Sequence, residues 1–415
     1  MSDLQKTTLP NGLRVLTEPM AGSRSASIGA WVAVGSRDEA PELSGASHFL
    51  EHLLFKGTQD RTAREVAEMI DGVGGDMNAF TAREHTAFYA RVPSTSRQMA
   101  TELLFDVVRR PALRQDDVDA ERQVINEELV AAFDTPDDVV HIVLYERLFD
   151  GHSLGREVLG EPETINALNA PDIGAFHQRW YGPSNIVIAA SGDVDHDELC
   201  TFAEASFGDL AENDKPERVV PNDLQAEMIA TELPVEQLHV AMGWRSLSHD
   251  DDRRYALAIA NQVLGGSPSS RLFQSIREEQ SLAYTVFSQS SGYADSGSAT
   301  IYAATSAQRG DELLGALRAE IDKLVTDGLT QRELDLARTG LEGAVVLGLE
   351  GSGARMTRLA TNEALRGQVL PIDAFLERLA ALTVDEVNRV IGDVYGGPAV
   401  TSLVGTGTAL EAIAG

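Results

Sequence analysis

Two histidines and a glutamate stand close together in the segment His48-Phe-Leu-Glu51-His52. Residues three and four apart share one face of a helix, so these three side chains would project together while the intervening apolar residues project roughly opposite. Two imidazoles can hold one metal ion, and a neighbouring carboxylate can take a proton from bound water. The alternative is a helix with two ordinary histidines. Because the chain has only nine histidines, we favour metal-dependent hydrolysis.

A metal site of this kind normally takes a third protein ligand and leaves one position for water. The pattern predicts a helix over residues 115–133, where Glu121 and Glu128 fall within or at the edge of the apolar arc and Glu127 falls on the far side. The arc is expected to face the core and consists of Val118, Val124, Ile125, Leu129 and Phe133. A carboxylate in an apolar face needs a partner, because burying an unpaired charge is costly. A metal ion would serve, and so would an arginine or a helix end.

An internal repeat organises the chain. Leu168 and Tyr181 in the first half match Leu382 and Tyr395 in the second, with the same 13-residue spacing, and each pair runs into an apolar strand. The offset is 214 residues, about half the chain. A repeat of this size indicates a domain duplication and not a solenoid.

We therefore expect an α+β protein of two similar domains, with a metal-binding domain at 1–210, a linker at 211–227 and a second domain at 228–415. In the first half, the patterns predict strands at 13–18, 27–34, 76–80 and 86–92 and helices at 44–55, 63–71, 95–109 and 115–133. In the second half, they predict strands at 239–244, 284–290 and 298–304 and helices at 252–264 and 271–279.

Composition excludes several classes of function. The net charge of −30 argues against nucleic acid and anionic membrane surfaces as partners, and it permits attraction to basic peptides. The single cysteine, Cys200, excludes an intramolecular disulfide and a thiolate metal cluster. No apolar run approaches the roughly 20 residues of a membrane helix. The first ten residues lack an apolar signal core, so we expect a cytoplasmic protein.

The segment Gly45–Thr58 resembles the zinc helix of the pitrilysin/insulinase family, most closely the mitochondrial-processing-peptidase branch and its bacterial relatives. In that family the third ligand is a glutamate 76 positions after the second histidine, and Glu128 stands 76 positions after His52 here. Glu121 matches a second acidic position of the family, and we assign it a catalytic role.

The resemblance implies one Zn²⁺ per chain, held by His48, His52 and Glu128, with Glu51 as the base that activates water. It also implies two domains of similar fold facing each other across a cleft. In the short-chain branch two such chains close into a chamber, so we expect a homodimer that cleaves unfolded peptides or presequence-like segments.

Further residues are assigned through the resemblance. The segment around Asn78, Ala79 and Phe80 is similar to the family's substrate-binding edge strand, which would add an extended peptide to the sheet; an ordinary edge strand is the alternative. Arg277 and Tyr284 match a pair in the inactive half that contacts substrate, and both side chains are suitable donors for a scissile carbonyl.

A non-catalytic core or partner subunit of a processing-peptidase-like assembly is the competing interpretation. Such family members characteristically lose metal ligands, whereas all four zinc-site residues are present here. The nearest counterpart of the glycine-rich loop of a non-catalytic subunit, residues 348–353, is short and lies in a helical context. These features favour a self-sufficient enzyme.

Overall fold

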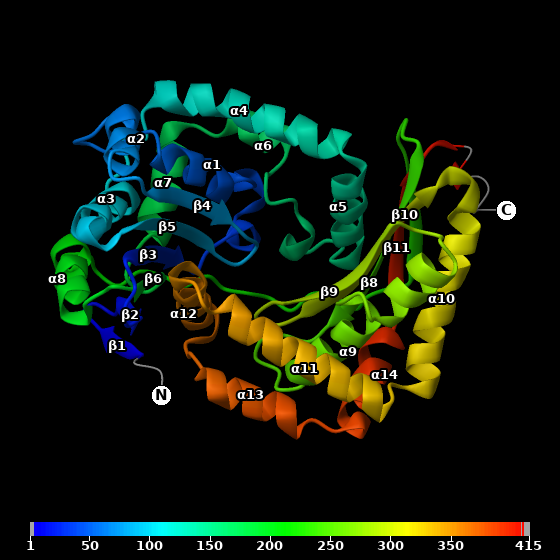
Figure 1. Cartoon of the computed structure of the whole chain (residues 1–415). Coiled ribbons are helices and arrows are strands. Elements are labelled where there is room, and N and C mark those ends of the chain that lie inside the picture. Colours follow the sequence, from blue (N-terminus) through cyan, green and yellow to red (C-terminus); the bar gives the residue numbers. More distant parts are fainter. Residues whose placement is uncertain (1–3, 408, 411–415) are drawn as a thin grey trace. The chain divides into compact units, whose positions relative to one another are not determined.

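The computed structural model describes residues 4–407 and 409–410, and Figure 1 gives the positions of its helices and strands along the chain. The described residues divide into two compact units, each with helices packed on one sheet. Among the described residues, unit 1 contains 4–129, 156–217 and 346–371, and unit 2 contains 130–155, 218–345, 372–407 and 409–410. No helix in the described part of the chain has the length and apolar character needed to cross a membrane.

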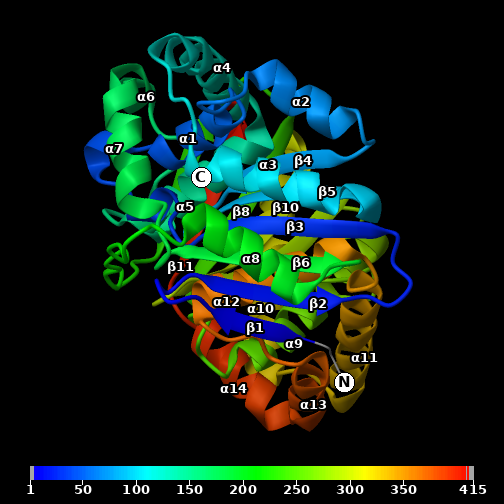
Figure 2. The same ribbon diagram turned by 90° about the vertical axis from the view of Figure 1, so that its left-hand side faces the viewer.

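Unit 1 is built on a six-stranded sheet whose order is β1-β2-β6-β3-β5-β4, as Figure 2 shows. The strands are β1 (Gln5–Thr8), β2 (Arg14–Pro19), β3 (Ser25–Val32), β4 (Asp76–Thr81), β5 (Thr86–Pro93) and β6 (Ile186–Gly192). Only β2 and β6 run parallel to each other, and the other neighbours are antiparallel. This order leaves β4 at one edge of the sheet.

Helices cover both faces of this sheet. The unit contains α1 (Ala46–Leu54), α2 (Ala63–Asp71), α3 (Arg97–Arg109), most of α4 (Gln115–Asp134), α6 (Pro162–Ala167), α7 (Ala170–Trp180), α8 (His196–Phe207) and α12 (Ser352–Arg366). Side chains alternate between the two faces of a strand, so Ile186 and Ile188 pack in the large core with α1 and α3, while Val187 and Ala189 pack with α12. Burial on both faces explains why β6 is apolar from Ile186 to Ala190.

The helix α12 comes from the second half of the sequence, and ion pairs hold it on unit 1. Glu363 of α12 is buried and pairs with Lys6 of β1 at 2.7 Å and with Arg14 of β2 at 3.6 Å. A further ion pair has the carboxylate on the sheet and the arginine on the helix: Glu18 of β2 is buried and pairs with Arg355 of α12 at 2.9 Å. Each buried carboxylate therefore has a cationic partner on the other element.

Unit 2 repeats the arrangement with a five-stranded sheet in the order β7-β11-β8-β10-β9. Its strands are β7 (Glu227–Glu232), β8 (Gln237–Ser246), β9 (Thr285–Gly292), β10 (Gly297–Ser306) and β11 (Ala399–Gly405). Its helices are α5 (Pro136–Leu148), α9 (Arg254–Gly265), a π-helix (Phe273–Glu279), α10 (Gly310–Asp327), most of α11 (Gln331–Gly348), α13 (Ile372–Ala381) and α14 (Val384–Tyr395). Again one neighbouring pair is parallel, β7 with β11, and the other pairs are antiparallel.

The matching strand orders confirm the prediction of two similar α+β units. The units are not the contiguous segments 1–210 and 228–415, because each takes one helix from the other half of the sequence. On unit 2 that helix is α5, whose Val140 and Leu144 pack with Ala241 of β8 and Val400 of β11. An apolar sheet face must be buried against another element, and the exchanged helices provide that cover.

Candidate metal centre

The helix α1 is fixed at its N-terminus by a glycine and a buried carboxylate. Gly45 has a φ of 90°, and a Cβ atom there would lie 2.8 Å from the carbonyl oxygen of Leu159. The two carboxylate oxygens of Glu39 accept from the amides of Gly45 and Ser47, each at 2.7 Å. Burial raises the pKa of Glu39 to about 7, although those amides oppose the shift. The start of α1 is therefore determined by contacts with specific residues, and this orients its side chains.

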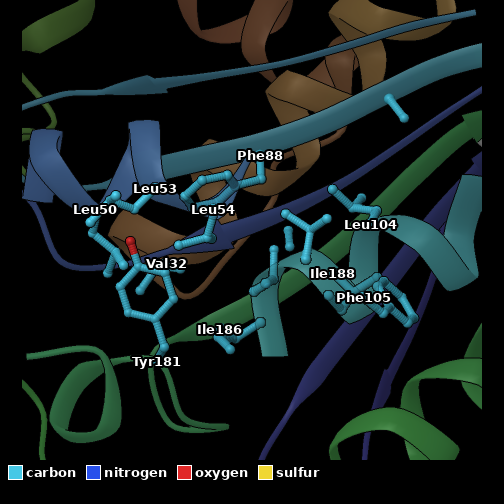
Figure 3. Close-up of a cluster of buried hydrophobic side chains, with 14 of the residues drawn as sticks. Val32, Leu50, Leu53, Leu54, Phe88, Leu104, Phe105, Tyr181, Ile186 and Ile188 are labelled. Atoms are coloured by element: carbon cyan, nitrogen blue, oxygen red, sulfur yellow. The ribbon is translucent and has the colours of Figure 1, made fainter. Parts of the chain in front are cut away.

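One face of α1 packs into the core of unit 1. Figure 3 shows Leu50, Leu53 and Leu54 beside Phe88 of β5 and Tyr181, which follows α7. This burial directs the remaining face toward α4 and β4. The predicted separation of polar and apolar faces on this helix agrees with the structure.

The opposite face of α1 brings three ligand atoms together with α4. The Nε2 atoms of His48 and His52 lie 3.2 Å apart, and Glu128 Oε2 lies 3.6 Å from the first and 3.5 Å from the second. Two zinc bonds of about 2.0–2.1 Å at a tetrahedral angle separate their ligand atoms by about 3.4 Å. The three separations therefore fit a single ion. In the described ranges, no other group of three or more His, Cys, Asp or Glu residues has ligand atoms that all lie within 4.8 Å of one another.

The protonation state of this group also suits a metal. Burial, and then the nearby charge of His52, lower the pKa of His48 to about 4, so its imidazole is neutral near pH 7 and can act as a ligand. The side chain of Glu128 is 43% exposed, in contrast to 11% for His48. Solvent therefore reaches the group on the Glu128 side, where a catalytic site needs an open position for water.

Glu51 lies on the same face of α1 but is held by another partner. Thr81 Oγ1, at the end of β4, donates to Glu51 Oε2 at 2.6 Å. Burial raises the pKa of Glu51, and the hydrogen bond from Thr81 and the charge of His52 oppose that shift. Glu51 is absent from the group of three converging ligand atoms, which is consistent with a base and not with a ligand.

Glu121 is not one of the three converging ligands but contacts one of them, His52, on the side of its ring away from the other two. Its Oε2 accepts from His52 Nδ1 at 3.1 Å, and its Oε1 forms an ion pair with Lys56. An Nδ1–H held by a carboxylate leaves the Nε2 lone pair of the imidazole available for a metal. This contact suits a residue that positions His52, and the catalytic role assigned to Glu121 stays a prediction. Sequence reasoning missed Lys56, although its spacing of four residues from His52 was a signal.

The helix α4 supplies Glu121 and Glu128, as predicted, but its apolar arc differs from the expectation. Val118, Ile125 and Leu129 are buried, whereas Val124 and Phe133 are each 44% exposed. The buried stripe is therefore narrower than the apolar pattern suggested, and it leaves Glu128 at its edge, half exposed.

The predicted substrate strand coincides with β4, which pairs with β5 and with no other strand of the described residues, so that one of its edges is open. Asn78 Oδ1 accepts from the amide of Ala79 at 2.8 Å. Phe80 is 37% exposed, and its ring meets that of Trp31 edge-on with centroids 6.2 Å apart. An open strand edge can take an extended peptide by adding a strand.

Arg277 and Tyr284 belong to unit 2, whereas the ligand group belongs to unit 1. The Arg277 guanidinium stacks on the ring of Tyr284 with its carbon 4.5 Å from the ring centroid, and it lies 4.6 Å from that of Phe273. Tyr284 is 79% exposed. The structure therefore brings the predicted pair into contact, and a role for the pair toward the metal group stays a prediction.

Comparison with known proteins gives matches along most of the chain. Residues 14–162 match the model described as insulinase (peptidase family M16), and residues 167–341 match that of the peptidase M16 inactive domain. An uncharacterised zinc protease of Streptomyces coelicolor is 41% identical over 97% of this chain and 89% of its own length. An uncharacterised zinc protease of Bacillus subtilis is 36% identical over 94% of this chain and 96% of its own length. A crystal structure of a protease from Helicobacter pylori shares the fold, with a TM-score of 0.91 and 22% identity over 97% of this chain and 100% of the other.

Proposed function

Because the chain belongs to the insulinase family of M16 peptidases, we propose that it is a zinc-dependent metalloendopeptidase that hydrolyses unfolded peptides. The observation that carries the proposal is the convergence of His48 Nε2, His52 Nε2 and Glu128 Oε2 within 4.8 Å of one another. The names of the relatives from S. coelicolor and B. subtilis support zinc as the metal.

The residues around the metal group have distinct tasks. A zinc ion bound there would supply Lewis acidity toward water and toward a peptide carbonyl. Glu51 takes the proton of the attacking water and delivers it to the leaving amine. Glu121 holds the ring of His52 through Nδ1, so that ring does not have to reorient during the reaction.

The substrate is an extended peptide that pairs with the open edge of β4. Main-chain hydrogen bonds along a strand edge are independent of sequence, which suits an enzyme for unfolded chains. Arg277 and Tyr284 then donate to the scissile carbonyl from the second unit. The proposal extends to a cytoplasmic homodimer enclosing a chamber, as the family resemblance implies, and sedimentation of the purified protein tests the dimer.

A non-catalytic structural subunit is the second candidate. It is favoured by the match of residues 167–341 to an inactive domain. That match concerns the second half of the duplication, whereas the first half retains the converging ligands and Glu51. We therefore propose that unit 1 carries both catalysis and the strand edge that pairs with the peptide, and that unit 2 adds the contacts of Arg277 and Tyr284.

Removal and return of the metal test the proposal. Purified protein should cleave members of a quenched fluorescent peptide library, lose this activity with a chelator and regain it when zinc is added. Full peptidase activity in protein shown by metal analysis to contain no metal would overturn the zinc mechanism. Zinc-loaded protein that cleaves no peptide would favour the structural subunit.

A further inference from the structure

We propose that Thr81 is a positioning residue for the base Glu51, so that the strand that takes the peptide also holds the group that activates water. The inference rests on the proposed function and adds a residue to it. The direct observation is the 2.6 Å hydrogen bond from Thr81 Oγ1 to Glu51 Oε2, which joins β4 to α1.

The contact matters because the Glu51 carboxylate could adopt either of two orientations. A carboxylate on the same helix face as two metal ligands can turn toward the ion and become a further ligand, or it can stay beside the open position and act on water. The hydroxyl of Thr81 donates to Oε2 and so holds the carboxylate at the end of β4. Thr81 therefore favours the arrangement in which Glu51 is a base.

Thr81 is itself well placed to fix this geometry. It is the last residue of β4 and pairs with Thr86 of β5, whose hydroxyl donates to the carbonyl oxygen of Val34 at 3.0 Å. The turn that follows is closed by the amide of Ala82, which donates to the carbonyl oxygen of His85 at 2.8 Å. The hydroxyl thus projects from a hydrogen-bonded strand end, and side chains on such supports are held more precisely than those on loops.

Because Thr81 belongs to β4, its hydrogen bond to Glu51 also links the base to the strand that binds peptide. Asn78 to Phe80, the proposed peptide-binding residues, precede Thr81 in the same six-residue strand. A peptide that pairs with β4 is therefore placed relative to Glu51 through the strand that holds the base. Loss of the Thr81 hydroxyl should disturb turnover while the main-chain edge still accepts peptide, so the effect belongs in kcat and not in KM.

The test uses the full chain and Thr81→Val, which keeps the shape and β-branching of the side chain and removes its hydroxyl. A hydrogen bond to a charged group contributes enough that kcat should fall about ten- to hundredfold, with KM changed less than about threefold. Thr81→Ser should restore most of kcat. Thr81→Ala is a second hydroxyl-free variant in case the valine protein folds poorly, and it should reproduce the loss in kcat.

The matched control is Thr8→Val, the same chemical change at an exposed threonine in β1 at the opposite edge of the same sheet. It should leave kcat, KM and zinc content at wild-type values. Thr81→Val should still contain zinc, because His48, His52 and Glu128 are intact. The affinity of the metal-free protein for a labelled peptide should also be unchanged, because the main-chain edge of β4 is intact.

The results separate this inference from the proposed function. A wild-type protein that hydrolyses peptides, together with a Thr81→Val protein of equal kcat, would overturn the inference alone. Loss of zinc or of peptide binding in Thr81→Val would also overturn it, because Thr81 would then have a general structural role. A zinc-loaded wild-type protein without hydrolysis would overturn the proposed function, and the inference would fall with it.

Discussion

Replacement of Glu121 should weaken zinc binding although Glu121 is not one of the converging ligands. The carboxylate accepts from His52 Nδ1 at 3.1 Å, and the Glu121 side chain is only 6% exposed. Without it, the imidazole loses the partner that fixes its orientation and keeps the proton on Nδ1. Loss of such a partner typically costs 10- to 100-fold in metal affinity, or about 1.4–2.8 kcal/mol.

Two substitutions of Glu121 should lower zinc affinity by different amounts within this range. Glu121→Gln keeps an oxygen that can accept from His52 but loses the charge that strengthens the bond, so we expect affinity to fall by about tenfold. Glu121→Ala removes the acceptor and leaves Lys56 without the carboxylate that it pairs with, so its loss should approach a hundredfold. The control is Glu127→Gln, which makes the same change at an exposed position of α4.

Zinc affinity would be measured by competition with a chromophoric chelator at fixed pH, with circular dichroism to compare the folds. Glu127→Gln should bind zinc as the wild type does. Wild-type affinity in both Glu121 variants would refute the reasoning, because the contact with His52 would then contribute nothing to the ligand.

Three other predictions concern pH, the second unit and charge. Burial holds the folded pKa of Glu39 at about 7 against an ordinary value of 4.5, so the stability contributed by its protonation is fully present below about pH 4.5 and lost as pH rises through 7. With chelator present, wild-type stability relative to Glu39→Gln should therefore fall by up to about 3 kcal/mol between pH 4.5 and 8 in denaturant unfolding; a constant difference would contradict the assignment. Arg277→Ala and Tyr284→Phe should each lower kcat/KM while metal analysis finds wild-type zinc, and unchanged kinetics would remove the pair from the site. Basic peptides should have higher kcat/KM than acidic ones of equal length at low salt, given the net charge of −30, and this advantage should shrink in high salt; equal values at low salt would leave the charge as a solubility feature.

Local features of the sequence predict the metal-binding half closely. The helix expected at 63–71 has those bounds in the structure, because Thr62 and Glu65 form a capping box at its start. The 3.6-residue period predicted that both histidines and Glu51 lie on one face of α1, and in the structure all three project from the face opposite the buried leucines. These features were predictable because each is determined by residues within a few positions of one another in the sequence.

Features that depend on distant partners were not predictable. Nothing local in the 352–366 segment indicates that α12 covers Trp31 and Val187 in unit 1, because a helix with an apolar stripe can pack on any apolar sheet face. A fragment that ends before α12 would expose that face. The contacts of Glu121 and Thr81 were missed for the same reason, since their partners lie 69 and 30 residues away.

Zinc content and peptide turnover, measured together in Glu51→Gln and His48→Ala, test the central claim most directly. Glu51 is assigned as the base and His48 as a ligand, so the two variants should fail in different ways. Glu51→Gln should retain about one zinc per chain and lose nearly all turnover, whereas His48→Ala should lose the zinc itself. A Glu51→Gln protein with near-native kcat, or a His48→Ala protein with full zinc content, would contradict the account.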